Sequence, residues 1–153
     1  MVRWGRMRVL GVAALITLGL TVAARGQQEG QPAGDTGRLA VAVEYTKGPV
    51  DKDHQIWIWV FDTPNITAET TPVATGSSAE NKSPYKFAGL PKEVFLAVAY
   101  DEKGGYDGTM GPPPPGTPVH IYGAAAGGAA SGVPTGGDDA TLEFAFDDSM
   151  RMP

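Results

Sequence analysis

Residues 55–62 (QIWIWVFD) constrain the fold of this chain more than any other stretch. In an extended backbone, Ile56 and Ile58 lie on one face, and Trp57 and Trp59 lie on the other. Both faces are therefore apolar, and the segment is rich in the β-branched and aromatic residues that favour strands. The pattern predicts a central strand of a sheet, covered on both sides.

The remaining apolar segments are short and strand-like as well. Residues 38–46 (RLAVAVEYT) alternate in polarity, which predicts a half-buried strand. Further strands are expected at residues 85–88, 94–100, 118–122 and 141–146, with a short one near 72–75. No segment after residue 24 shows a sustained helical period with helix caps. About seven short strands between turns that contain glycine and proline predict an all-β domain, a single Greek-key β-sandwich.

Two segments between the expected strands are predicted to be loops. Residues 111–116 (GPPPPG) must be extended, because each proline fixes φ and blocks a helix. Residues 123–137 are of low complexity and are expected to form a mobile loop. The domain is expected to span residues 38–148, and residues 149–153 are expected to be a disordered tail.

Residues 1–24 have the layout of a secretory signal peptide. Three arginines among the first eight residues precede an uncharged apolar run of 16 residues (9–24) that ends in small side chains. The run is shorter than the roughly 20 residues that a membrane-spanning helix needs. The sequence therefore predicts a secreted or periplasmic protein, with a flexible polar leader at residues 25–37 and no membrane span in the mature chain.

Charge and cysteine content exclude several kinds of partner and chemistry. Without residues 1–24 the chain keeps 9 basic and 17 acidic residues, a net charge of −8. Nucleic acids and anionic membranes are bound through basic patches, so neither is an expected partner. The chain has no cysteine, which excludes thiol catalysis, cysteine-ligated zinc and iron–sulfur clusters.

One segment resembles a known fold family. Residues 85–101 (YKFAGLPKEVFLAVAYD) place one strand before a Leu-Pro turn and a second strand after it, which ends in an aspartate. This arrangement is similar to that of transthyretin-like (prealbumin-like, carboxypeptidase regulatory-like) β-sandwich domains, and the similarity covers roughly residues 38–146. A group of uncharacterised exported bacterial proteins of this shape continues with a loop rich in Asp and Asn. Here Glu93 replaces the usual turn glycine, and Lys103 and Gly105 replace asparagines of that loop.

Residues 101–108 (DEKGGYDG) are a candidate cation site. Asp101, Glu102 and Asp107 supply carboxylate oxygens, the ligands that Ca²⁺ prefers, within one loop. Lys103 places an ammonium group where such a loop needs an oxygen, and the glycine two positions later supplies no side chain. The alternative is a tight turn, in which two adjacent glycines permit positive φ. The sequence leaves both interpretations open and favours the turn.

Trp57 and Trp59 are the candidate ligand-binding residues. A row of exposed aromatic rings at strand spacing can stack on sugar rings, whereas the same row between two sheets belongs to the core. Because both faces of this strand are apolar, the core interpretation is favoured. Carbohydrate binding through the two indoles remains the alternative.

The two histidines, His54 and His120, give little support to catalysis. His54 follows Asp51 and Asp53 in a predicted loop, and closely spaced loop residues of this kind are usually solvated rather than bound to a metal. No G-x-S-x-G nucleophile elbow is present, so a Ser-His-Asp triad is not expected. The expected protein is therefore not an enzyme.

These observations predict an exported, non-enzymatic β-sandwich module with a binding or structural role. Its expected partner is a carbohydrate, a component of the cell envelope, or a protein that pairs with an exposed strand edge. Two alternatives remain. One is a calcium-stabilised structural domain that uses the loop of residues 101–107, and the other is a carbohydrate-active accessory domain.

Overall fold

The computed structural model describes residues 37–125, 128–136 and 140–153, and the predicted signal peptide lies outside these ranges. Within them the chain is all-β and contains no helix. The strands are β1 (Gly37–Tyr45), β2 (Ile56–Phe61), β3 (Ala74–Ser78), β4 (Tyr85–Leu90), β5 (Glu93–Tyr100), β6 (Val119–Ile121), β7 (Val133–Pro134) and β8 (Thr141–Phe146). The prediction of an all-β domain is confirmed. Since these ranges hold no helix, none of their segments forms a helix that could cross a membrane.

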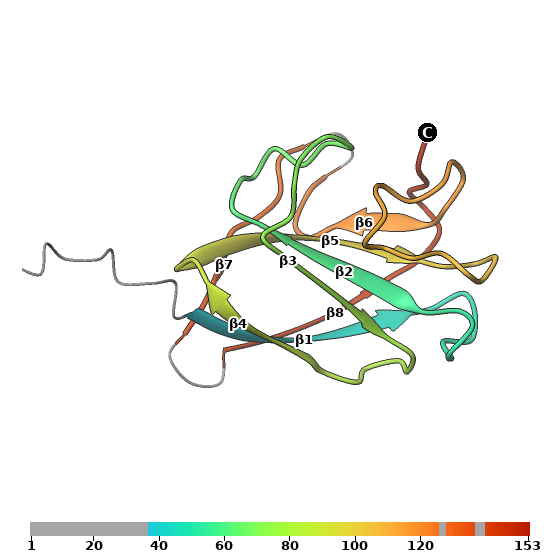
Figure 1. Cartoon of the computed structure of the whole chain (residues 1–153), viewed down its shortest axis with the longest axis horizontal. Helices are drawn as coiled ribbons and strands as arrows, with labels where there is room; N and C mark the ends of the chain where they lie inside the picture. The colour runs from blue at the N-terminus through green and yellow to red at the C-terminus, as the bar shows by residue number, and fades with distance from the viewer. Residues whose placement is uncertain (1–36, 126–127, 137–139) are drawn as a thin grey trace, which may run out of the picture. The chain divides into compact units, whose positions relative to one another are not determined.

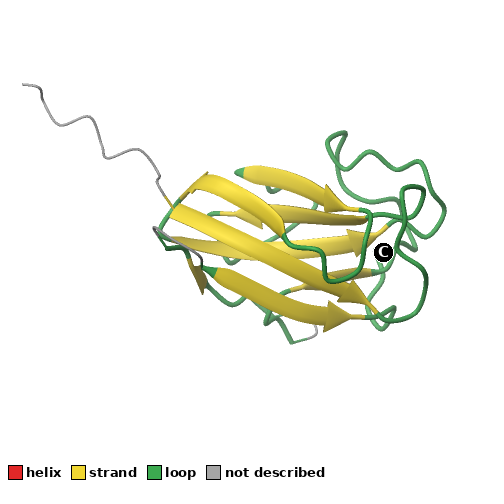
Figure 2. Ribbon diagram, turned by 90° about the horizontal axis from the view of Figure 1, so that it is seen from below, coloured by secondary structure: helices red, strands yellow, loops and turns green. Residues whose placement is uncertain are grey.

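The strands form two sheets, which Figures 1 and 2 show as two layers. The first has the order β4-β1-β8, in which β1 is antiparallel to β4 and parallel to β8. The second has the order β3-β2-β5-β6 and is antiparallel throughout, and β7 pairs with the first residues of β5. Strand β2 lies between β3 and β5, so its predicted central position is confirmed.

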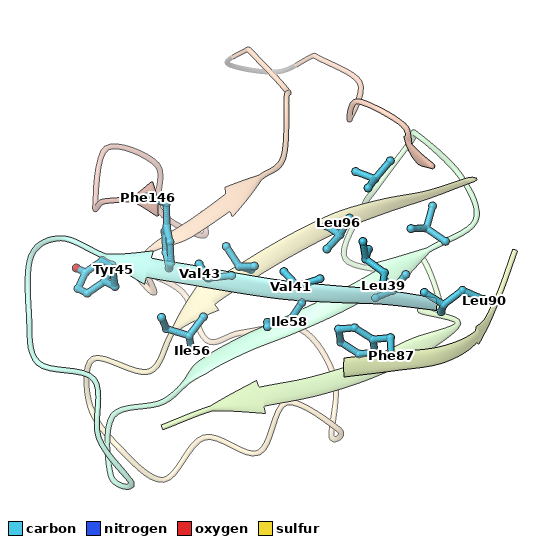
Figure 3. Packing of buried hydrophobic residues seen from close by; sticks show 14 of the residues in the cluster. Leu39, Val41, Val43, Tyr45, Ile56, Ile58, Phe87, Leu90, Leu96 and Phe146 are labelled. Atoms are coloured by element: carbon cyan, nitrogen blue, oxygen red, sulfur yellow. The ribbon is translucent and has the colours of Figure 1, made fainter. Parts of the chain in front are cut away.

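The main core lies between the two sheets. Every second residue of β1, from Leu39 to Tyr45, is buried, as its alternating pattern predicts. On the facing sheet Ile56, Ile58 and Val60 are fully buried. Figure 3 shows side chains of β1 gathered with those of β2, β4 and β5 in this layer. Burying each such aliphatic side chain contributes about 1.5–3 kcal/mol, which makes this layer the main source of stability.

The other face of β2 carries a second, smaller cluster. Because successive side chains of a strand point to opposite faces, Trp57, Trp59 and Phe61 lie on the outer side of the five-stranded sheet. Loops cover them there: Ile66 and Tyr106 pack on this cluster from two different connections. The prediction that β2 is covered on both sides is therefore confirmed, and the outer cover consists of loops rather than of a third sheet.

The segment after β8 differs from the predicted disordered tail at residues 149–153. Its backbone runs beside the residues that precede and begin β6: the amide of Val119 donates to the Met150 carbonyl, and the amide of Met152 donates to the Thr117 carbonyl, both at 2.9 Å. The Arg151 guanidinium also donates to the carbonyl of Gly116. These bonds pair backbone groups of the residues that follow the prolines with the last residues of the chain.

Candidate functional site

The outer face of the five-stranded sheet carries a groove of about 550 Å³. Its floor consists of side chains from three neighbouring strands: Trp59, Phe61, Ala97, Val119 and Ile121. Residues 66–72, residues 108–113 and the last two residues of the chain form its walls. This volume lies within the roughly 300–1,000 Å³ that is usual for sites of small ligands.

At the floor of the hollow a small residue lies between two large ones. Strand pairing places Ala97 of β5 beside Trp59 of β2 on one side and beside Ile121 of β6 on the other. Directly opposed residues share a face, with Cβ atoms about 4.5–5.5 Å apart. The methyl group of Ala97 leaves the space between its two neighbours open. We call this arrangement the Trp59–Ala97–Ile121 row.

Hydrogen bonds hold the wall formed by residues 108–113, and the loop that leads to it, in place. The Trp59 indole N–H donates to the carbonyl of Gly108 at 3.0 Å, and this bond is buried. The backbone amide of Tyr106 donates to Asp101 Oδ2 at 2.8 Å, and its hydroxyl donates to the carbonyl of Gly111. Burial, with a smaller effect of nearby carboxylates, raises the pKa of Tyr106 to about 12. The hydroxyl therefore remains a hydrogen-bond donor at neutral pH. The bond between Trp59 and Gly108 attaches this wall directly to the floor of the groove.

The opposite wall is a compact turn rich in threonine. The amide of Thr67 donates to Thr70 Oγ1 at 2.9 Å, and the amide of Thr70 donates to the Thr67 carbonyl at 3.1 Å. The turn is tied to the rest of the domain through Pro64, whose carbonyl accepts a bond from the amide of Ala130 at 3.0 Å. Short side chains with hydroxyl groups therefore border an apolar floor.

The three carboxylates of the predicted calcium site have other partners. Asp101 is only 7% exposed and accepts the Tyr106 amide bond described above. Glu102 pairs with Arg151 at 2.9 Å, and this hydrogen bond lowers the pKa of its carboxyl. Asp107 Oδ1 accepts bonds from the hydroxyl and the amide of Thr109, at 2.7 and 2.9 Å, which lower its pKa. Among the residues that the structure describes, no group of three or more potential ligands is placed to hold a metal ion.

The backbone geometry of residues 101–108 therefore supports a tight turn. Gly104 and Gly105 adopt φ of +75° and +83°, the left-handed conformation that glycine accepts without strain. The calcium hypothesis gains no support from the arrangement of its carboxylates.

Trp57 and Trp59 have different surroundings, although they share a face. Trp59 lines the groove, but it is only 7% exposed and its N–H is already bonded. Trp57 does not line the groove; its ring meets that of Tyr106 edge-on, with centroids 5.9 Å apart. The Trp57 N–H is buried and has no acceptor among the described residues. Trp59 is therefore mostly covered, whereas Trp57 is half-buried.

The histidines are separate from each other. His54 belongs to a local turn in which Asp51 Oδ1 accepts the amides of Asp53 and His54, each at 2.9 Å. His120 borders the groove, but its ring lies against Phe144, with centroids 5.7 Å apart. Burial lowers the pKa of the His120 imidazole. His54, Asp51 and Asp53 therefore form a hydrogen-bonded turn.

Several groove residues were not candidates from the sequence. Phe61 shares the outer face of β2 with the two tryptophans, so its strand period could have indicated it. The importance of Ala97 follows from strand register, which the sequence does not reveal. The threonine-rich turn at residues 66–72 has no apolar pattern that would predict its position over a sheet.

Comparisons of the chain with protein-family models, characterised proteins and solved structures found no match. No family or function can therefore be transferred to it by similarity. The groove and its geometry provide the basis for a functional argument.

Proposed function

We propose that this chain is an exported, non-enzymatic binding module, and that the groove over the five-stranded sheet is its ligand site. The observation that carries the proposal is the Trp59–Ala97–Ile121 row, which leaves a hollow of about 550 Å³ over a packed sheet. The floor consists of strands and one wall is bonded to it, so the site is largely preformed. A preformed site loses little conformational entropy when a ligand binds.

A non-catalytic role fits the surroundings of the groove. In the described residues that border it, the one imidazole, that of His120, lies against Phe144 and Phe146. Acyl transfer would instead need a histidine hydrogen-bonded to a nucleophilic hydroxyl and to an orienting carboxylate. Secretion or a periplasmic location remains a prediction from residues 1–24, and it is part of this proposal.

We also propose that the fold is a Greek-key sandwich of the transthyretin-like type. The chain passes from one sheet to the other between β1 and β2, between β3 and β4, between β4 and β5, and between β7 and β8. The connection between β4 and β5 is the Leu90-Pro91 turn on which the sequence resemblance rests. Repeated crossing between two sheets supports a Greek-key connection rather than a simple meander.

The proposal is tested by filling the groove. We would titrate the protein with 4-phenyl-1-butanol, a neutral apolar probe, and follow the ¹H–¹⁵N NMR signals of the Trp59 indole and the backbone of Ala97 and Ile121. The expected result is saturable shifts at these three positions. Replacing Ala97 by Val and then by Leu should weaken binding step by step, because the added carbons occupy the hollow.

The matched control is Ala88→Leu, the same change at an exposed position of β4 in the other sheet. It should leave binding unchanged. Thermal unfolding of each variant shows whether the fold is kept, and the smaller Ala97→Val change keeps the test informative if the leucine variant is unstable. Absence of saturable shifts, or equal binding by the Ala97 and Ala88 variants, would refute the groove as a ligand site.

A further inference from the structure

Three of the segments that build the groove contain acidic residues but no lysine or arginine. Residues 57–75, 95–99 and 106–121 contain Asp62, Glu69 and Asp107, but no lysine and no arginine. Glu69 lines the groove itself. Asp62 directly follows Phe61 and Asp107 directly precedes Gly108 in the chain, but neither of them lines the groove. Glu69 is therefore the carboxylate at the border of the apolar floor.

These carboxylates are not neutralised by the protein. In the described part of the chain, every ion pair involves other acidic residues, and none includes Asp62, Glu69 or Asp107. Arg151 precedes the residues that close the groove, but it is paired with Glu102 at 2.9 Å and with Asp148 at 3.2 Å. A positive charge that enters the groove would therefore meet the carboxylate of Glu69, which takes part in no ion pair among the described residues.

Lys103 is the basic residue nearest in sequence to the wall formed by residues 108–113. It borders a different hollow, which is lined by the other side of the loop of residues 101–107, and it does not line the groove. Its ammonium group is thus not placed to serve as the counter-ion of Glu69. The groove remains an apolar surface with an acidic border.

We propose, on the basis of the proposed function, that the ligand is a cationic amphiphile. Its apolar body lies on the Trp59–Ala97–Ile121 row, and its ammonium or guanidinium group lies beside Glu69. The apolar body provides most of the affinity, because burial of apolar surface is the larger favourable contribution. The charge provides selection, since a carboxylate at a partly exposed border attracts a cation and repels an anion.

The size of the effect follows from the exposure of Glu69. Exposed ion pairs contribute about 0.2–1 kcal/mol, so one pair changes affinity by about 1.4-fold to fivefold. The attraction between two exposed charges is strongest at low ionic strength, where the screening length exceeds about 10 Å. Added salt should therefore reduce the preference for a cation.

The test uses three probes that share a phenyl ring on a four-carbon chain: 4-phenylbutan-1-amine, 4-phenyl-1-butanol and 4-phenylbutyrate. At pH 7 these are cationic, neutral and anionic, so they separate charge from apolar contact. Dissociation constants are measured by NMR titration at low and high salt. The amine should bind most tightly and the carboxylate most weakly, and high salt should bring the three values closer together.

Glu69→Gln identifies the group responsible, with Glu143→Gln as the matched control, because Glu143 is an exposed residue of β8 in the other sheet. Glu69→Gln should weaken binding of the amine about 1.4-fold to fivefold and leave the alcohol unchanged. Equal binding of all three probes would overturn the cation inference while leaving the groove as a ligand site. A preference for the amine that survives Glu69→Gln would also overturn it, and binding of none of the probes would refute the proposed function as well.

Discussion

Gly108 is the position where the addition of one methyl group should disturb the candidate site most. Its backbone lies against the indole of Trp57, and a Cβ atom at this position would be 2.3 Å from Cε3 and 2.5 Å from Cδ2 of that ring. Its carbonyl also accepts the buried bond from the Trp59 indole. The Gly108→Ala change therefore acts on both tryptophans of β2 at once.

The cost can be worked from these contacts. Carbon atoms normally approach to about 3.5–4.0 Å, so the ring or the loop must move by more than about 1 Å. The Trp57 ring cannot rotate away freely, because Tyr106 packs against it. Overpacking of this kind costs about 1–3 kcal/mol, and weakening of the Trp59 hydrogen bond adds about 1 kcal/mol. We expect Gly108→Ala to lower the free energy of unfolding by about 2–4 kcal/mol.

Urea unfolding followed by circular dichroism measures this change. A double-mutant cycle with Trp57→Leu tests its cause, because removal of the ring should relieve the overlap and recover part of the loss. Gly105→Ala is the control, since its φ is +83° and no atom lies within 4 Å of the added Cβ. It should lose about 1–2 kcal/mol through backbone strain alone, and Trp57→Leu should not rescue it. A Gly108→Ala variant as stable as the parent, or one that Trp57→Leu fails to rescue, would refute the reasoning.

Three further outcomes are expected. Trp59→Phe should lower the free energy of unfolding by about 1 kcal/mol more than Trp57→Phe in urea titrations, because only the first leaves a buried carbonyl without its donor; equal losses would contradict this. Burial lowers the pKa of His120 below its usual value of 6.5, despite the opposing charge of Asp147, so the unfolded chain takes up the proton first. The imidazole of His120 should not affect stability above about pH 6.5, and stability should fall as pH drops towards the lowered pKa. If the slope of the free energy of unfolding against pH is unchanged in His120→Gln, His120 is not the cause. Excess Ca²⁺ followed by EDTA should leave the melting temperature unchanged, since the carboxylates in the loop of residues 101–107 have other partners, whereas a rise of several degrees with Ca²⁺ would restore the calcium hypothesis.

The strands with strong alternation or strong apolar character could be predicted from the sequence. The segments expected at 38–46, 55–62 and 141–146 agree with β1, β2 and β8 to within one residue at each end. In these segments the side-chain pattern itself decides which residues face the core. β3 was expected near residues 72–75, but it runs from Ala74 to Ser78. Its polar side chains carry little signal, and pairing with β2 sets its position.

Other elements depend on contacts that the sequence does not show. β7 lies within residues 123–137, which were expected to form a loop, and its two residues are ordered by pairing with Glu93 and Val94. The segment 149–153 has no strand pattern, yet it is bonded to residues 116–119.

The candidate site was predicted only in part. The shared outer face of Trp57 and Trp59 follows from their spacing in the chain. The hollow beside them depends on the register that places Ala97 opposite Trp59 and Ile121, and register is a property of the assembled sheet. Local patterns therefore indicate the aromatic face but not the groove.

The parallel pairing of β1 with β8 determines when this domain can finish folding. The hydroxyl of Thr46 donates to the carbonyl of Phe146, a residue 100 positions later in the chain. Strand β1 lies at the centre of its sheet, and both of its neighbours are made after it. Pairing over such long sequence separations slows folding, because the chain must close a large loop before the contact forms. Until β8 arrives, β1 keeps an open edge that other chains can pair with, so this domain needs protection from aggregation for the whole period of its synthesis.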